Sequence, residues 1–339
     1  MTGILTVLCV ILIFGLIVFI HEFGHFITAK LFGVTVHEFA IGMGPKLFGK
    51  QKGDTFYSVR LIPMGGYVKM EGEDEDSDSE GAFSKKKPWQ RFIILFAGAF
   101  MNLVLGFSLL VTYNAVDPNL TAIPTMEVVA LQEGMGAEKA GILPGDVIVK
   151  VDGSRIHTHL DLNLALNEKE SVSVLVDRGG EKMNFSVPVT VVDNRALLGF
   201  SRNTREKTIG NLISYSYFEA FSIVKMTYQS FFGMFTGSVS VDQMSGPVGI
   251  VNEIGTAVKS GFLDVLFIAL LISLNLGVVN LLPFPALDGG RIVFVLWEII
   301  TRKKVKPEHE GIIHFIGFVL LILLVLYVTK NDIVRLFTK

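Results

Sequence analysis

Long apolar stretches dominate the pattern of this chain. Four of them carry few charges and are long enough for a helix to cross a bilayer, which takes about 17–25 residues; they are Ile4–Phe32, Phe92–Tyr113, Phe262–Leu282 and Ile312–Val328. A fifth stretch, Leu212–Phe235, contains Glu219 and Lys225 among many aromatic residues, which predicts a helix lying in the membrane interface. We therefore predict a polytopic α-helical membrane protein with four transmembrane helices.

The segments between these stretches have other patterns. Val34–Met70 is rich in glycine, aromatic and β-branched residues, which predicts short strands joined by turns in a membrane-associated β-hairpin region. Met126–Val192 alternates apolar and polar residues, as a strand-rich domain outside the membrane does. The predicted division is residues 1–113 with the hairpin at 34–70, a strand-rich domain at 114–195, an interfacial amphipathic linker region at 196–261, and residues 262–339.

Composition agrees with a lipid environment. Of the 339 residues 50% are hydrophobic and 18% are charged, and the mean hydropathy is +0.52. The net charge of −2 argues against nucleic acid as a partner. Cys9 is the single cysteine, which excludes an internal disulfide and a site built from several thiolates. The N-terminus lacks the basic region and cleavage site of a signal peptide, so we expect the first stretch to be retained.

Basic residues gather after the first and third apolar stretches. The first of these loops contains Lys46, Lys50, Lys52, Arg60, Lys69 and Lys85–Lys87, and the second contains Arg291, Arg302, Lys303, Lys304 and Lys306. The positive-inside rule makes both loops cytoplasmic. Both chain termini and the segment Asn114–Gly261 are then extracytoplasmic, although the tail with Lys330, Arg335 and Lys339 fits this less well.

Two histidines and a glutamate lie close together within the first apolar stretch. On a helix, His21 and His25 are one turn apart and face the same way, which is the spacing of two zinc ligands. Glu22 is placed to accept a proton from a water molecule at the metal. Ionisable groups at membrane depth are costly and mostly functional. The alternative, a polar cluster that links helices by hydrogen bonds, would bury three such groups in five residues.

A second motif ends the third stretch. Pro283, Pro285, Gly289 and Gly290 must break the helix, and broken backbone at membrane depth is tolerated only inside protein or beside a watery cavity. Asp288 in this break is the natural third ligand, with a fourth position left for water.

Asn280, just before the break, could hydrogen-bond a substrate or a developing oxyanion, or it could tie neighbouring helices together. Both motifs reach the same half of the membrane only if Leu212–Phe235 does not cross it. The remaining histidines lack the spacing of metal ligands, except for His157 and His159 in a predicted loop, and we expect none in the site; they are His37, His157, His159, His309 and His314.

These residues resemble a known family. The pair of motifs, His21–His25 and Asn280–Gly290, is similar to that of the site-two protease family of intramembrane zinc metalloproteases. Further segments resemble its bacterial RseP/RasP branch: Ile62–Met70, Phe96–Asn102 (with Ala99 where many relatives have proline), Ser245–Gly249, and Gly136–Gly153, which resembles a PDZ domain.

The resemblance implies one Zn²⁺ per chain, with His21, His25 and Asp288 as ligands and Glu22 as general base. It implies that Gly65, Gly66 and Tyr67 belong to a membrane-reentrant hairpin that clamps the substrate. It also implies a single extracytoplasmic PDZ domain, where some relatives have two; this domain would bind a peptide end or act as a size filter.

The implied function is regulated intramembrane proteolysis in the bacterial cytoplasmic membrane. Substrates would be single-span membrane proteins already trimmed by another protease, such as anti-sigma factors, or remnant signal peptides. Two alternatives remain open at this point. One is a membrane-tethered zinc protease acting on soluble or unfolded proteins, and the other is a catalytically silent PDZ receptor on a membrane anchor.

Overall fold

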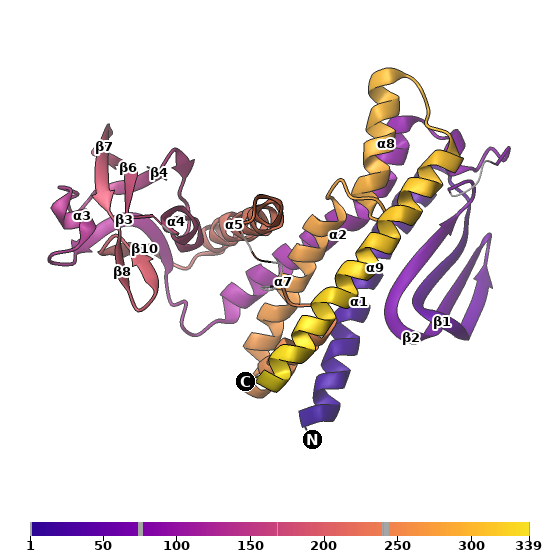
Figure 1. Cartoon of the computed structure of the whole chain (residues 1–339), viewed down its shortest axis with the longest axis horizontal. Coiled ribbons are helices and arrows are strands. Elements are labelled where there is room, and N and C mark those ends of the chain that lie inside the picture. Colours follow the sequence, from indigo (N-terminus) through magenta and orange to yellow (C-terminus); the bar gives the residue numbers. More distant parts are fainter. Residues whose placement is uncertain (1, 74–76, 168, 239, 241–243, 339) are drawn as a thin grey trace. The chain divides into compact units, whose positions relative to one another are not determined.

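The computed structural model describes residues 2–73, 77–167, 169–238, 240 and 244–338. The chain forms two compact units (Figure 1). The helical unit comprises Met1–Leu109 and Ser230–Lys339, and the sheet unit comprises Leu110–Gln229.

Four helices in the described part of the chain are long and apolar enough to cross a membrane, as predicted. They are α1 (Thr2–Leu31), α2 (Pro88–Val116), α7 (Phe262–Asn280) and α9 (Pro307–Thr338). The predicted interfacial stretch forms α5 (Ile209–Thr236), which is not among these four. Two shorter helices, α6 (Pro247–Ser260) and α8 (Asp288–Thr301), have no counterpart in the sequence-based prediction.

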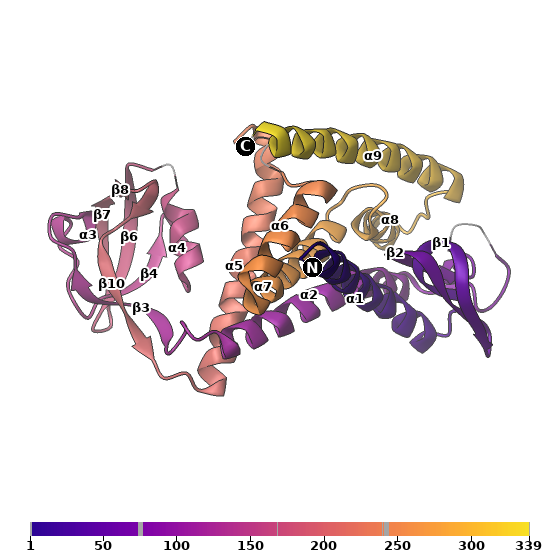
Figure 2. The same ribbon diagram turned by 90° about the horizontal axis from the view of Figure 1, so that it is seen from below.

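Close helix crossings hold the helical unit together (Figure 2). A Cβ atom at Gly24 of α1 would lie 2.5 Å from the carbonyl oxygen of Ala97 in α2, and one at Gly277 of α7 would lie 3.0 Å from that of Ala99. Small residues allow membrane helices to approach this closely. At the start of α6, the Gly249 N–H donates to the buried carboxylate of Asp332 in α9 at 2.8 Å.

The hairpin region forms an antiparallel sheet on α1, built from β1 (Val36–Lys52) and β2 (Thr55–Met70) (Figure 1). Each strand bends back, so residues 38–41 of β1 pair with residues 66–69 of β2 on one side and with residues 56–59 on the other. The prediction of short strands was wrong, because glycines with positive φ at the bends turn the chain without ending the ladder; they are Gly42, Gly44 and Gly65. A 3₁₀ turn, η1 (Phe83–Lys85), precedes α2.

The sheet unit contains strands in the order β10-β3-β4-β6-β7, with β5 paired to β4 and a separate β8–β9 pair. The strands are β3 (Ile123–Leu131), β4 (Val147–Val151), β5 (Ser154–Arg155), β6 (Ser171–Arg178), β7 (Glu181–Pro188), β8 (Thr190–Val192), β9 (Arg195–Leu197) and β10 (Phe200–Arg205). Helices α3 (Gly136–Lys139) and α4 (His159–Leu166) complete it with the first part of α5. Because β10 pairs with β3, the sheet extends beyond residue 195, where the strand-rich domain was predicted to end.

Hydrogen bonds made by buried polar side chains stabilise the sheet unit. Asp146, in the Pro-Gly-Asp turn before β4, accepts from Arg178 Nε at 2.7 Å and Nη2 at 2.8 Å, and from the Leu143 N–H at 2.8 Å. The hydrogen bonds from Arg178 lower the pKa of this carboxyl group. Ser222 of α5 donates to Asp161 of α4 at 2.9 Å. These contacts satisfy charges that burial would otherwise penalise.

Candidate metal centre

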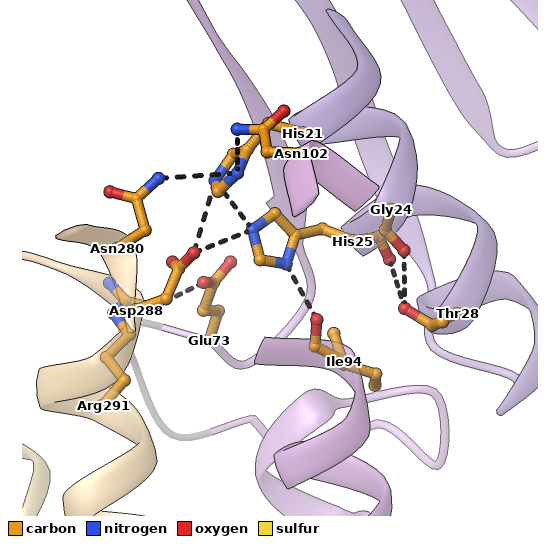
Figure 3. A network of polar contacts seen from close by, with 10 residues as sticks. All are labelled: His21, Gly24, His25, Thr28, Glu73, Ile94, Asn102, Asn280, Asp288 and Arg291. Atoms are coloured by element: carbon orange, nitrogen blue, oxygen red, sulfur yellow. Dashed lines mark hydrogen bonds and ion pairs between the residues drawn. The ribbon is translucent and has the colours of Figure 1, made fainter. Parts of the chain in front are cut away.

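Three side chains from distant parts of the sequence meet in the helical unit (Figure 3). His21 Nε2 lies 3.2 Å from His25 Nε2 and 3.3 Å from Asp288 Oδ2, and His25 Nε2 lies 3.4 Å from the same oxygen. The histidines come from one face of α1, and Asp288 is the first residue of α8. The structure thus brings together the three predicted ligands.

The spacing of these atoms fits a zinc ion. Ligand atoms at about 2.0–2.1 Å from a tetrahedral zinc are about 3.3–3.4 Å apart, close to the separations observed between the two Nε2 atoms and Oδ2. Oδ2 of Asp288 is also buried without a hydrogen-bond partner among the described residues. A cation between the three side chains would satisfy it, so this donor set could hold a metal.

The second ring nitrogen of His25 supports the same interpretation. His25 is buried, and its Nδ1 lies 2.8 Å from the carbonyl oxygen of Ile94 in α2. A carbonyl can only accept, so Nδ1 carries the proton and Nε2 presents its lone pair to the metal position. A Cβ atom at Gly98 would lie 2.2 Å from His25 Nε2. Glycine at position 98 therefore leaves the space that this imidazole occupies.

The amides of Asn102 and Asn280 both lie next to His21. Its Nδ1 lies 3.3 Å from Asn102 Nδ2 and 3.5 Å from Asn280 Nδ2. Asn102 is fully buried, and its Oδ1 has no hydrogen-bond partner among the described residues. Rotation of this amide by half a turn would place Oδ1 against His21 Nδ1–H, which satisfies both atoms and leaves His21 Nε2 for a metal. The amide of Asn102 is a partner of His21 that sequence reasoning did not identify.

The loop between α7 and α8 positions Asp288. A Cβ atom at Gly289 would lie 2.1 Å from the carbonyl oxygen of Leu282, and one at Gly290 would lie 2.4 Å from that of Phe284. Any larger residue would therefore push the first turn of α8 away from the loop. The two glycines explain how a loop this tight can deliver a carboxylate at the start of a helix.

A histidine of α9 holds the same loop, contrary to our expectation that the isolated histidines lie outside the site. The backbone N–H of Ala286 donates to His314 Nδ1 at 2.9 Å. Ala286 has φ +77°, a conformation that L-residues rarely adopt, so the contact supports a strained position two residues before Asp288. Nothing in the sequence spacing signals this contact, because His314 and Ala286 lie 28 residues apart on different elements.

The predicted substrate-binding residues lie in different surroundings. A Cβ atom at Gly66 of β2 would lie 3.1 Å from Cγ of Glu22, so this strand runs beside the predicted general base. Gly65 forms a bend of β2, and Asn280 lies at His21. The hydroxyl of Tyr67 contacts Arg60, which donates to Glu38 at 2.8 Å. Tyr67 therefore belongs to a polar cluster of the sheet itself.

One further ion pair borders the centre. Arg291, on the first turn of α8, bonds the carboxylate of Glu73 (Figure 3). Glu73 belongs to the acidic segment 71–80, in which residues 74–76 lie outside the described part of the chain. This contact connects the acidic segment to the helix that begins with Asp288.

The family model of peptidase family M50 matches residues 9–324. The chain belongs to peptidase family M50. FN1322 of Fusobacterium nucleatum is 39% identical to it over 340 residues, covering 98% of this chain and 100% of that protein. The zinc metalloprotease RasP of Shouchella clausii is 34% identical over 420 positions, covering 98% and 100%. The regulator of sigma-W protease RasP of Bacillus subtilis is 30% identical over 421 positions, covering 98% and 99%.

This M50 peptidase is a zinc metalloprotease of the site-two protease family, with relatives in the RasP branch, which confirms the predicted family, enzyme class and cofactor. The alignments with both RasP proteins span more positions than the 339 residues of this chain, so those relatives contain segments without a counterpart here. The PDZ domain of the SdrC-like protein of Listeria innocua covers 25% of this chain at 21% identity, with a TM-score of 0.22 that is too low to assign the fold of the sheet unit.

Proposed function

We propose that this M50 peptidase hydrolyses peptide bonds inside the membrane, with zinc held by His21, His25 and Asp288. The proposal rests on one observation: three metal-ligating side chains from two distant parts of the chain meet at one point. Two ligands lie on α1, which is long and apolar enough to cross a membrane, and the third follows α7, which is also long and apolar enough. A hydrolytic site built on such helices lies at the depth of the lipid.

Bound zinc supplies a Lewis acid that polarises the scissile carbonyl and makes water a better nucleophile. Glu22 takes the proton of the attacking water and passes it to the leaving amine nitrogen. Asn280, at His21, donates its amide to the substrate backbone or to the developing oxyanion. Ile94 and Asn102 hold the two imidazoles in orientation throughout.

The edge of β2 presents the substrate to these residues. Residues 66–69 pair with β1 on one side only among the described residues, and Gly66 lies beside Glu22. A substrate helix hides its carbonyls in hydrogen bonds, so it must unwind before hydrolysis. An unwound segment gains new backbone hydrogen bonds by adding itself as a strand to this edge, with Gly65, Gly66 and Tyr67 in the clamp.

The substrates we propose are single-span membrane proteins, such as anti-sigma factors, and remnant signal peptides. The name of the Bacillus subtilis relative, regulator of sigma-W protease, supports this class. The basic loops support a cytoplasmic location for the hairpin and for the loop after α7, in a bacterial cytoplasmic membrane. The termini and the sheet unit, which we propose contains a PDZ domain (residues 114–195), are then extracytoplasmic.

The test uses full-length protein in lipid nanodiscs with a tagged single-span substrate, a version carrying a bulky outer domain, and a water-soluble peptide of the same cleavage sequence. We expect cleavage of the short membrane substrate only, zinc near one per chain, no cleavage with zinc retained in Glu22→Gln, and loss of zinc in His21→Ala. Equal cleavage of the soluble peptide would favour a membrane-tethered protease acting on soluble proteins. Full activity of Glu22→Gln would contradict the proposed chemistry.

A further inference from the structure

An apolar cavity of the helical unit lies away from the metal centre. It encloses about 490 Å³ between α1 and one face of the β1–β2 sheet, within the range of roughly 300–1,000 Å³ typical of ligand pockets. Phe19, Phe23 and Phe26 line it from α1, and their spacing of four and three residues puts them along one face of that helix. His21 and His25 lie along another face, so the cavity is separate from the proposed ligands.

The sheet side of the cavity is also apolar, except at one end. Phe39 and Tyr57 are cross-strand partners, as are Ile41 and Val59, and all four line the cavity. Lys50, the partner of Tyr57, lines it as well. Lys52 follows two residues later and therefore points to the same face. Both lysines are exposed, and neither has an ion-pair partner among the described residues.

The sheet is polarised along its length. Thr55 Oγ1 donates to the carbonyl of Val36 at 2.8 Å, which places the Lys52–Thr55 turn at the end of the sheet where β1 begins, near the C-terminus of α1. The opposite end carries the apolar side chains of Met43 (51% exposed), Leu61 (55%) and Ile62 (49%). The apolar end of the sheet suits contact with the hydrocarbon of a membrane, and the end with the lysines suits contact with lipid headgroups.

We propose that this cavity binds one anionic phospholipid, with an acyl chain among the aromatic side chains and the phosphate at Lys50 and Lys52. Asp54 in the turn reduces the positive charge there but leaves it net positive. The proposal rests on the membrane location in the proposed function, but not on its metal chemistry. The ligand packs on Phe39 and Ile41, which are the cross-strand partners of Val68 and Gly66 in the proposed substrate strand.

The test is native mass spectrometry of the full-length protein released from detergent, titrated separately with dioleoylphosphatidylglycerol, dioleoylphosphatidylcholine and inorganic phosphate. We expect one tightly bound phosphatidylglycerol, weaker binding of phosphatidylcholine, and no retention of inorganic phosphate. The double variant Lys50→Gln/Lys52→Gln should bind phosphatidylglycerol about thirtyfold more weakly, since each lysine near an anionic surface contributes about 1 kcal/mol.

Two control variants distinguish a specific lipid-binding site from nonspecific electrostatic attraction of anionic lipid to the protein. Lys46 places its Nζ over the ring of Phe56 at 4.8 Å, on the face away from the cavity, so Lys46→Gln should change the affinity less than about twofold. Val59→Trp fills the cavity without changing charge and should weaken binding about tenfold, because the acyl chain loses buried methylenes. All variants should keep their zinc, which shows that they fold.

The proposal is overturned if phosphatidylglycerol and phosphatidylcholine bind alike, if inorganic phosphate alone is retained, or if Lys46→Gln weakens binding as much as the double variant. It is also overturned if Val59→Trp binds lipid normally but loses cleavage of the single-span substrate, because the cavity would then accept substrate. Loss of cleavage in Glu22→Gln with lipid binding intact separates this site from the proposed catalytic function.

Discussion

Asp146 of the sheet unit is buried and Asp288 of the helical unit is half-buried, and the two carboxylates have opposite surroundings. Asp146 of the sheet unit has both carboxylate oxygens bonded to Arg178, and its charge is compensated within the protein. Asp288 of the helical unit faces two imidazoles and keeps one buried oxygen without a hydrogen-bond partner in the described structure. A carboxylate that the protein satisfies is structural, whereas a carboxylate with an unsatisfied buried oxygen beside two imidazoles fits the role of a metal ligand.

Glycines beside the metal centre and glycines in the turns of the sheet unit have different roles. In the sheet unit Gly141, Gly145 and Gly153 have positive φ and form turns. In the helical unit Gly24 and Gly98 are helical, and their value is the absent side chain, which lets α1 approach α2 and His25 fit between them. Replacing a glycine beside the metal centre should therefore distort the geometry of the ligands, whereas replacing a turn glycine should lower the stability of the sheet unit.

The largest effect is expected from Gly98→Ala. The added methyl would lie 2.2 Å from His25 Nε2, so the imidazole must move, and zinc affinity should fall by more than about hundredfold with loss of cleavage. The measurement is zinc content after dialysis against graded chelator. Gly15→Ala on α1 is the matched control, because a Cβ there meets nothing within 4 Å. Normal zinc retention in Gly98→Ala would show that His25 is not a ligand.

Asp146→Ala should destabilise the sheet unit by about 2–3 kcal/mol, because Arg178 and the Leu143 N–H lose their acceptor. Hydrogen exchange of sheet-unit peptides in the full-length protein, followed against urea concentration, measures this change. Zinc affinity should stay unchanged. The exposed Glu181 provides the control, Glu181→Ala, with an expected change below about 0.5 kcal/mol. If Asp146→Ala and Glu181→Ala change the stability of the sheet unit equally, Asp146 has no special structural role.

Asn102→Leu should lower zinc affinity about tenfold to hundredfold, because His21 loses the partner that fixes its tautomer. Asn102→Asp sharpens the comparison, since its oxygen can accept from His21 Nδ1 and should retain most of the affinity. Competition with a fluorescent chelator measures both. If the two variants bind zinc equally weakly, the amide of Asn102 does not act through its oxygen.

His314→Ala should lower kcat/KM for the single-span substrate about fivefold with zinc retained, since one hydrogen bond to the loop contributes about 1 kcal/mol. His314→Gln, which offers an acceptor to Ala286, should recover part of the loss. The exposed His309 on the same helix is the control, and His309→Ala should match the parent. An unchanged rate in His314→Ala would show that the loop holds Asp288 without α9.

The smallest effect concerns pH. Arg178 lowers the folded-state pKa of Asp146, so near the unfolded value of about 3.9 the unfolded state binds more protons. The stabilisation of the folded sheet unit by the Asp146–Arg178 pair is therefore fully present at neutral pH, and it is lost as the pH falls through the folded-state pKa of Asp146. Arg178→Gln should flatten this dependence in the hydrogen-exchange protection of sheet-unit peptides between pH 5 and 3. If protection changes with pH equally in the parent and in Arg178→Gln, the pair does not cause the pH dependence.

The features predicted well from sequence are those encoded locally. The four apolar helices follow from length and hydropathy, and the juxtaposition of His21 with His25 follows from one helical turn. Helix α8 was not predicted, because its glycine pair and charges imitate a loop. The contact of His314 with Ala286 and that of Asn102 with His21 depend on tertiary packing, which no spacing in the sequence encodes. The roles of Glu22 and Asn280 stay predictions.

The tight packing of Gly289 and Gly290 against the carbonyls of the preceding loop has a consequence for protein engineering. With two prolines in the loop and no room for a single methyl group beside it, this side of the centre leaves a designer almost nothing to vary. Efforts to retune metal preference should begin instead with the paired imidazoles on the first helix.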